Sequence, residues 1–208
     1  MIDYLRDGPA IYEQSFKTIR AESDLSGLDP IASRTVVRMI HACGMVDLTE
    51  DIEVSPGFGA AAESALQAGA PVLCDTSMVA AGITRSRLPA GNEIICTLPD
   101  RRVPDLAREL RTTRTAAAME LWRETLKGSL AVIGNAPTAL FRLLEMIDEG
   151  ADLPAAIVGV PVGFVGAIES KVALAEHASA PEFLVVHGRR GGSAMAVAAV
   201  NALGTRKE

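Results

Sequence analysis

Apolar residues recur along the chain at two different spacings, and each spacing predicts a different kind of element. In the first third they return every three or four residues, which is typical of helices that pack on one face. This pattern predicts helices from Gly8 through Ile19, over 30–43 and over 60–68. The helix over 30–43 also has boundary signals, because Asp29 and Pro30 suit a helix start and Gly44 suits a helix end.

The second half instead alternates short apolar runs with glycine-bearing loops and helical stretches. The runs and their loops are 130–133 with 134–137, 155–160 with 161–166, and 183–187 with 188–193. Helices are expected to follow these loops, the first of them running to Glu149. Two earlier runs, 70–75 and 93–98, also suit strands, with helices over 76–81 and 104–109.

Strand–loop–helix units in succession indicate parallel strands joined by right-handed crossovers, and strands that are apolar throughout belong to sheets covered on both sides. We therefore predict an α/β fold. It has a mostly parallel central sheet with helices on both faces, a Rossmann-like three-layer arrangement, preceded by a helical N-terminal portion. The absence of any linker-like tract or repeat favours a single domain over 1–208.

Composition excludes several classes of partner. The net charge is −6 and aromatic residues make up 4% of the 208 residues, which argues against nucleic-acid binding. No apolar stretch reaches membrane-spanning length, and the first residues lack a secretory pattern. We expect a cytoplasmic protein that binds neither nucleic acid nor membrane.

Metal and nucleotide motifs are also missing from the sequence. Three cysteines, Cys43, Cys74 and Cys96, are far apart and form no C-x-x-C pair, so buried reduced thiols are expected and no metal site is predicted. Neither a P-loop nor a complete G-x-G-x-x-G follows a strand, and no G-x-S-x-G elbow occurs. A nucleotide cofactor and α/β-hydrolase chemistry therefore have no motif to support them.

His41 is the first candidate for chemistry. At about 100° per residue it shares one stripe of its helix with Arg34 and Arg38, opposite an apolar stripe. Its place in the last turn favours the charged imidazolium, which can donate a proton near neutral pH. Spacing alone leaves two roles open, a helix C-terminal cap, which is the commoner one, and a catalyst.

The glycine loops are the second candidate, because the ligand of an open parallel sheet lies at the carboxyl ends of its strands. Free amides there attract anions, and Arg189 and Arg190 add guanidiniums that can hold a carboxylate or phosphate. Lys171 is expected early in the helix after 161–166, where a cation needs an anion such as a ligand carboxylate or Glu169. His187 suits ligand contact and turn packing equally.

Several motifs occur together in one order along the chain. They are Arg38-Met39-Ile40-His41-Ala42-Cys43-Gly44, Gly69-Ala70-Pro71-Val72-Leu73-Cys74-Asp75, Leu88-Pro89-Ala90-Gly91-Asn92-Glu93, Ile133-Gly134-Asn135-Ala136-Pro137-Thr138-Ala139-Leu140, Pro161-Val162-Gly163-Phe164-Val165-Gly166, Glu169-Ser170-Lys171 and Gly191-Gly192-Ser193-Ala194. In this combination, which spans nearly the whole chain, the sequence closely resembles the precorrin-8X methylmutase family of cobalamin biosynthesis.

The resemblance implies an isomerase that moves a methyl group from C-11 to C-12 of a corrinoid ring, giving hydrogenobyrinate, or cobyrinate where cobalt is present. It implies no separate cofactor and a homodimer that holds substrate near the subunit boundary, with neighbouring cobalamin-pathway enzymes as further expected partners. His41 matches the family's catalytic histidine, while Ser15, Arg38 and Arg114 match substrate contacts.

The same substrate gives the other basic residues a role. A broad apolar ring fringed with carboxylates suits Lys171, Arg189 and Arg190 as further substrate contacts. Two departures from the family pattern are Thr76-Ser77, where some relatives are acidic, and His187, where arginine is common. Two rival functions remain open at this point, a corrinoid carrier without catalysis and a nucleotide-dependent enzyme.

Overall fold

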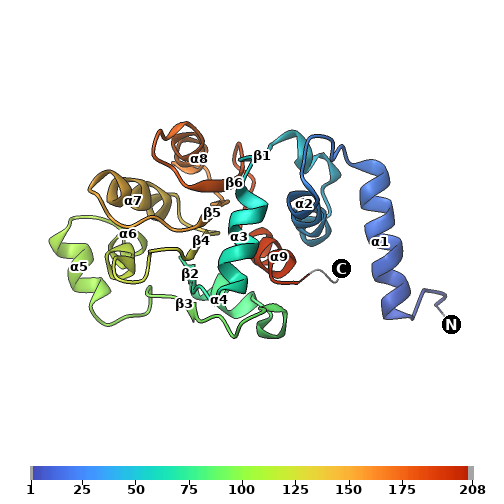
Figure 1. Ribbon diagram of the computed structural model, residues 1–208, viewed down its shortest axis with the longest axis horizontal. Coiled ribbons are helices and arrows are strands. Elements are labelled where there is room, and N and C mark those ends of the chain that lie inside the picture. Colours follow the sequence, from blue (N-terminus) through green and yellow to red (C-terminus); the bar gives the residue numbers. More distant parts are fainter. Residues whose placement is uncertain (1, 206–208) are drawn as a thin grey trace.

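A six-stranded sheet lies at the centre of the computed structural model, which describes residues 2–205 (Figure 1). Its strand order is β1-β6-β5-β4-β2-β3, and all neighbours are parallel except β1, which runs antiparallel to β6. The strands are β1 Ile52–Val54, β2 Val72–Cys74, β3 Ile94–Ile95, β4 Leu130–Ile133, β5 Ala156–Gly159 and β6 Glu182–Val186. The mostly parallel sheet predicted from the apolar runs is confirmed.

Helices cover both faces of this sheet. They are α1 Gly8–Glu22, α2 Pro30–Cys43, α3 Phe58–Gln67, α4 Ser77–Gly82, α5 Val103–Glu109, α6 Arg114–Met119, α7 Pro137–Asp148, α8 Ala167–Glu176 and α9 Ser193–Leu203. Figure 1 shows α5 to α8 on one side of the sheet and α3 and α9 on the other. The helical N-terminal portion stacks outward from there, with α2 against α9 and α1 beyond α2.

Two hydrophobic cores follow from the alternation of side chains along each strand. In β4, Leu130 and Val132 enter the core shared with α2, α3 and α9, whereas Ala131 and Ile133 enter the core shared with α7 and α8. All four residues are fully buried. The two-faced burial explains why these strands are apolar throughout, and it confirms the predicted α/β layers.

Most predicted elements are present. The strand β4 has the bounds of its apolar run and β6 is shifted by one residue, whereas β2, β3 and β5 are shorter than the runs that predicted them. Among the strands and α-helices of the described residues, β1 and α6 were not predicted. The edge strand β1 has only three residues, and its central Glu53 faces solvent, so it gives almost no apolar signal. The helix α6 has only six residues and begins after Thr113, whose hydroxyl accepts from the Ala116 amide at 3.2 Å.

Cysteines, membrane spans and metal ligands can be checked directly. All three cysteines are free, and Cys74 is buried as expected, but Cys43 and Cys96 are only half-buried. Within residues 2–205, no helix combines the length and apolar character needed to cross a bilayer. The same residues contain no cluster of three or more His, Cys, Asp or Glu side chains that could hold a metal ion.

Candidate active site between the two N-terminal helices

The position of His41 is fixed by well-defined ends of α2. At the start, the Asp29 carboxylate accepts hydrogen bonds from the amides of Ile31 at 2.8 Å and Ala32 at 3.1 Å. At the end, Gly44 adopts φ +71°, a left-handed conformation that favours glycine. The predicted caps are therefore confirmed, and they place the half-buried His41 in the last turn.

The neighbouring helix α1 contacts the imidazole at Nδ1 and at the ring. Ser15 Oγ lies 2.9 Å from His41 Nδ1, within hydrogen-bond distance. The rings of Tyr12 and Phe16 lie 5.3 and 5.1 Å from the His41 ring, centroid to centroid. The guanidinium of Arg38 lies 5.4 Å from the Phe16 ring centre, so the predicted residues Ser15, Arg38 and His41 form one cluster.

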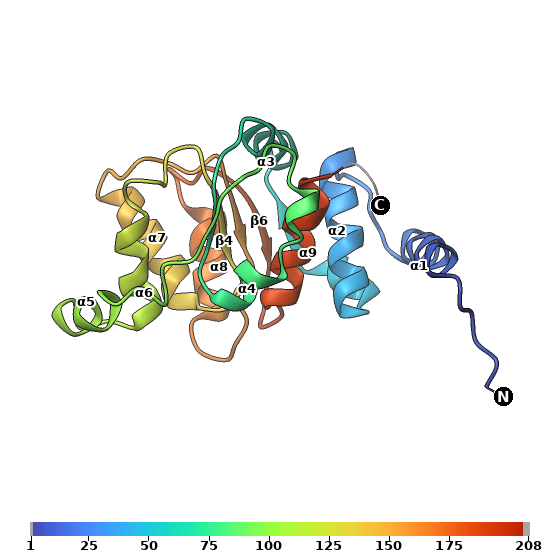
Figure 2. The ribbon, with the colours of Figure 1, turned by 90° about the horizontal axis from the view of Figure 1, so that it is seen from below.

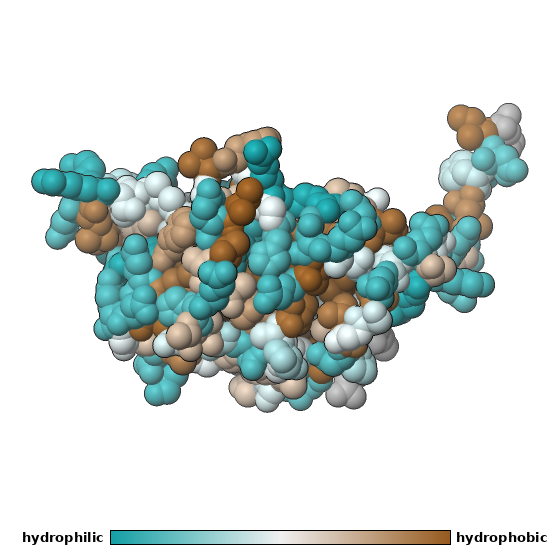
Figure 3. Space-filling view, turned by 90° about the horizontal axis from the view of Figure 1, so that it is seen from above, coloured by the Kyte–Doolittle hydropathy of each residue, from teal (hydrophilic) through white to brown (hydrophobic). Residues whose placement is uncertain are grey.

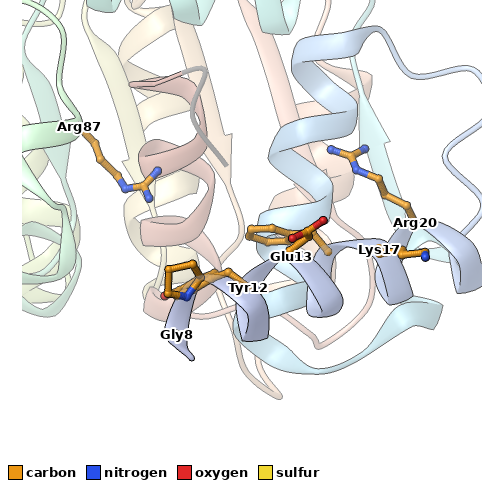
Figure 4. Close-up of a pocket in the computed structure, with 8 residues that line it drawn as sticks. Gly8, Tyr12, Glu13, Lys17, Arg20 and Arg87 are labelled. Atoms are coloured by element: carbon orange, nitrogen blue, oxygen red, sulfur yellow. The ribbon is translucent and has the colours of Figure 1, made fainter. Parts of the chain in front are cut away.

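A groove of about 870 Å³ opens beside this cluster. Its lining residues are Gly8, Pro9, Tyr12, Glu13, Phe16, Lys17, Arg20 and Arg87. Figure 4 shows α1 along one side of the groove and Arg87 reaching toward it from the opposite side. Aromatic rings therefore adjoin His41, while the charged lining residues are three cations, Lys17, Arg20 and Arg87, and one acid, Glu13.

Arg34 does not join the cluster, although it lies on the same stripe of α2. Its Nε donates to the Ala202 carbonyl at 3.1 Å, and its Nη2 donates to Glu63 at 3.4 Å. Both charged side chains are only 14% exposed. Arg34 therefore ties α2 to α9 and α3, and the cationic surface predicted for this stripe narrows to Arg38 and His41.

The loop after β6 contacts the segment that follows α2, through the side chain of Arg190. The Arg190 side chain donates to Asp51 and, at 2.9 Å, to Asp47, and it also approaches Met45. Hydrogen bonding to Asp51, and less to Asp47, raises the pKa of Arg190. Its charge is thus already compensated within the chain.

Arg189 lies at the tip of the loop after β6 and is exposed to solvent. Its guanidinium lies 5.2 Å from the ring centre of Phe164, which belongs to the loop after β5. Of the two arginines predicted to hold an anion, Arg189 is the one that faces outward without an acidic neighbour among its described contacts.

Lys171 is placed differently from its predicted role as a substrate contact. Its side chain is fully buried, and Nζ donates to the carbonyl oxygens of Arg190 at 2.8 Å and Pro161 at 3.2 Å. The predicted compensating anion was a ligand carboxylate or Glu169, but Glu169 is exposed. Two carbonyl oxygens accept from the ammonium instead, and the acidic charge that acts on it is that of Asp51. Lys171 is therefore not placed to contact substrate directly, because a fully buried amine cannot reach a ligand unless the two loops separate.

Burial of Lys171 leads to a pH-dependent stability. Desolvation lowers its pKa from 10.5 to about 8, and the charge of Asp51 opposes that shift. Between about pH 8 and 10.5 the unfolded chain binds more protons at this lysine, so its contribution to stability rises with pH. We expect the free energy of unfolding of the wild type minus that of Lys171→Met to be larger at about pH 10 than at about pH 8. Urea unfolding at both values measures it, and a decrease would contradict the expectation.

The loop at 134–136 is not free to hold an external anion, contrary to its predicted role. The buried carboxylate of Asp75 accepts hydrogen bonds from the amides of Gly134, Asn135 and Ala136 at 2.9 to 3.0 Å. Burial raises the pKa of Asp75, and the three amides act in the opposite direction. Asp75 thus anchors the start of α7 from the end of β2.

The remaining candidates lie away from the cluster around His41. Arg114 is exposed at the start of α6, on the opposite side of the sheet (Figure 2). His187 Nε2 lies 2.7 Å from Glu53, which favours its packing role, and His177 lies 3.2 Å from Asp148. The departure Thr76-Ser77 has a local function, since Thr76 caps α4 through the Val79 amide at 3.5 Å.

Comparison with known proteins agrees with this arrangement. The family model described as precorrin-8X methylmutase matches residues 10–205. The chain belongs to the precorrin-8X methylmutase family. A precorrin-8X methylmutase from Pseudomonas aeruginosa is 62% identical over 208 residues, which is 100% of both chains. The crystal structure of precorrin-8X methyl mutase from Thermus thermophilus has a TM-score of 0.85 and 40% identity, covering 95% of each chain.

More distant members carry a different name. A cobalt-precorrin-8 methylmutase from Methanothermobacter thermautotrophicus is 37% identical over 180 residues, covering 86% of this chain and 83% of its own. The family predicted from the motifs is thus confirmed. The chain is a methylmutase, an intramolecular transferase of the isomerase class.

Several site residues were not predicted from the sequence. Tyr12 and Phe16 face His41 together with Ser15, at helical spacings of three and four residues. That spacing places the three side chains on one face of the helix and could have indicated them from the sequence. An aromatic pair on a helix, however, is more often part of a hydrophobic core. Arg20 continues the same face of α1 four residues after Phe16, and Lys17 also lines the groove.

Proposed function

We propose that this methylmutase converts precorrin-8X to hydrogenobyrinate in cobalamin biosynthesis, with His41 as the general acid. Membership of the family, with 62% identity over the full chain, supports the overall reaction. The hydrogen-bonded pair of Ser15 and His41 beside an open groove is the observation that supports the role of the imidazole.

Ser15 fixes how the imidazole is used. When His41 is charged, its Nδ1–H donates to Ser15 Oγ and its Nε2–H remains to donate to substrate. Transfer of that proton to a ring nitrogen or adjacent carbon biases the conjugated ring toward rearrangement. The bond from the methyl carbon to C-11 then breaks as its bond to C-12 forms, and the product returns the proton to His41. The rearrangement balances within one molecule, so the proposal uses no cofactor.

The groove suits the two kinds of surface that the substrate presents. Tyr12 and Phe16 offer apolar faces for the ring, and Lys17, Arg20 and Arg87 surround them with positive charge for the carboxylate fringe. We propose Arg38, Arg114 and Arg189 as further carboxylate contacts. Arg190 can contribute its side chain only by exchanging Asp47 and Asp51 for substrate.

We also propose that the natural substrate carries no cobalt. The support is the difference in identity, 62% to a precorrin-8X methylmutase against 37% to a cobalt-precorrin-8 methylmutase. Purified protein should therefore convert precorrin-8X, seen as a change in the absorbance spectrum, with a kcat/KM at least about tenfold above that for cobalt-precorrin-8. Equal values would contradict the preference for the metal-free ring, and no spectral change with either substrate would contradict the activity.

The functional unit that we propose is a homodimer in the cytoplasm. Free thiols at all three cysteines are consistent with a reducing compartment. The segment before α1 projects from the body (Figures 2 and 3), and α1 packs against α2 at its edge. Together they expose apolar side chains including Leu5 at 49% and Ile11 at 43%. Apolar residues on a projecting element are typical of surfaces that a second subunit covers.

A further inference from the structure

Lys171 joins the two loops that follow β5 and β6. Its ammonium donates to one carbonyl in each loop, Pro161 at 3.2 Å and Arg190 at 2.8 Å, and its side chain is fully buried. A buried ammonium is costly unless polar atoms surround it, so these carbonyls hold it in place as much as it holds them. The residue is buried beneath the two loops that it connects.

The backbones of the same two loops also touch directly. The Gly163 amide donates to the Arg189 carbonyl at 3.3 Å, and the Gly192 amide donates to the Val160 carbonyl at 2.9 Å. Gly191 has φ +155°, and a Cβ placed there would lie 2.4 Å from the Val160 carbonyl oxygen. Only glycine permits this approach, so the two loops form one unit with Lys171 beneath it.

This unit presents a guanidinium against an aromatic face. Arg189 from one loop lies 5.2 Å from the ring centre of Phe164 from the other, and Phe164 is 86% exposed. A groove of about 270 Å³ adjoins the pair, and Met45, Val162 and Met195 are among its lining residues. The pair therefore offers one contact for a carboxylate and one for a flat apolar edge, but only while the two loops keep their relative position.

We propose that Lys171 is a positioning residue, which holds the loops together so that Arg189 and Phe164 jointly bind the carboxylate-bearing edge of the macrocycle. The inference rests on the proposed function, in which Arg189 contacts substrate. Without the ammonium, the carbonyls of Pro161 and Arg190 lose their buried donor, and the loops separate to hydrate them. Lys171 thus acts through Arg189 and touches no substrate atom.

A double-mutant cycle tests this role. In Lys171→Met we expect KM and the dissociation constant for hydrogenobyrinate to rise about tenfold, with kcat within about twofold of wild type. Arg189→Ala should also weaken hydrogenobyrinate binding by about tenfold or more, because it removes a charge-assisted hydrogen bond. Because both changes disable the same contact, the double variant should bind about as weakly as Arg189→Ala alone.

The cycle separates failure of the inference from failure of the proposed function. Unchanged binding in Arg189→Ala would overturn the proposed substrate contact. Weaker binding in Arg189→Ala, combined with no effect of Lys171→Met or with effects that multiply in the double variant, would overturn the positioning role alone. The matched control is Lys127→Met, a lysine that is 81% exposed beside Asp152 and should leave every constant unchanged.

A second variant, Lys171→Gln, tests the same role if Lys171→Met folds poorly. Lys171→Gln keeps a donor that can satisfy one of the two carbonyls, so its rise in KM should be smaller than that of Lys171→Met. In both variants, amide hydrogen exchange should be faster than in the wild type in peptides covering 160–166 and 188–193, and it should be unchanged in the strand β4. Exchange that accelerates equally in β4, or loss of folding in both variants, would overturn the role, because the core would then depend on Lys171.

Discussion

Replacing His41 by asparagine should lower kcat by about 10²- to 10⁴-fold, the range expected for loss of a positioned general acid. The dissociation constant for hydrogenobyrinate should stay within about twofold, because the aromatic and cationic groups around the groove are untouched. Asparagine is close to the size of the imidazole and can still hydrogen-bond to Ser15, which lies 2.9 Å from Nδ1 in the wild type. It cannot, however, supply a proton to the ring.

The measurement is single-turnover absorbance kinetics with precorrin-8X, together with titration of hydrogenobyrinate into each variant. His177→Asn is the matched control, because His177 also ends a helix but lies beside Asp148, on α7. It should turn over at the wild-type rate. Full activity in His41→Asn would show that the imidazole delivers no proton, and loss of product binding would show that it acts as a binding group instead.

A second substitution, Ser15→Ala, tests whether the Ser15 hydroxyl orients the imidazole. The hydroxyl orients the imidazole without itself carrying the proton, so Ser15→Ala should lower kcat by less than His41→Asn does. The two changes made together should cost little more than His41→Asn alone, since both act on the same proton transfer.

The local chemistry of the chain predicted the frame of this site well. Asp29, Pro30 and Gly44 define α2 through interactions within a few residues of one another, and such short-range signals are readable in a sequence. The strands β4, β5 and β6 are apolar on both faces, which only a doubly covered sheet explains. The motifs that indicated the family lie mostly in the turns and loops that this frame positions.

What the sequence could not supply was the partner of each polar group. Arg34 and Arg38 look alike on a helical wheel, yet Arg34 pairs with Glu63, and Arg38 lies over Phe16. The amides at 134–136 resemble an anion site, but the carboxylate of Asp75, 59 to 61 residues earlier, fills it. Long-range pairings of this kind depend on the strand order, which spacing along the chain does not specify.

The distance between Arg114 and His41 is another feature that spacing along the chain does not predict. The resemblance places Arg114 near the same ring as His41, but α6 and α2 lie on opposite sides of the sheet, far apart in both ribbon views (Figures 1 and 2). One macrocycle cannot touch both residues of a single chain in this arrangement. A two-fold dimer removes the conflict if the ring lies at the boundary, with His41 from one subunit and Arg114 from the other.

Subunit complementation should therefore restore activity when His41→Asn and Arg114→Ala chains are combined. Each variant alone carries the same defect in both of its sites. A heterodimer instead has one site with both changes and one site with neither, so it should regain about half of the wild-type activity per dimer. Coexpression with two different affinity tags, followed by tandem purification, isolates that heterodimer for the absorbance assay.

The outcome separates a shared site from two independent ones. If each site is built within one subunit, every site in the heterodimer keeps one of the two changes, and activity stays at the average of the parent variants. A heterodimer of His41→Asn and Lys127→Met chains is the control, because it should reach about half of the wild-type value under either arrangement. Restoration would place Arg114 opposite His41 across the boundary, where the exposed apolar residues of α1 are also expected to be covered.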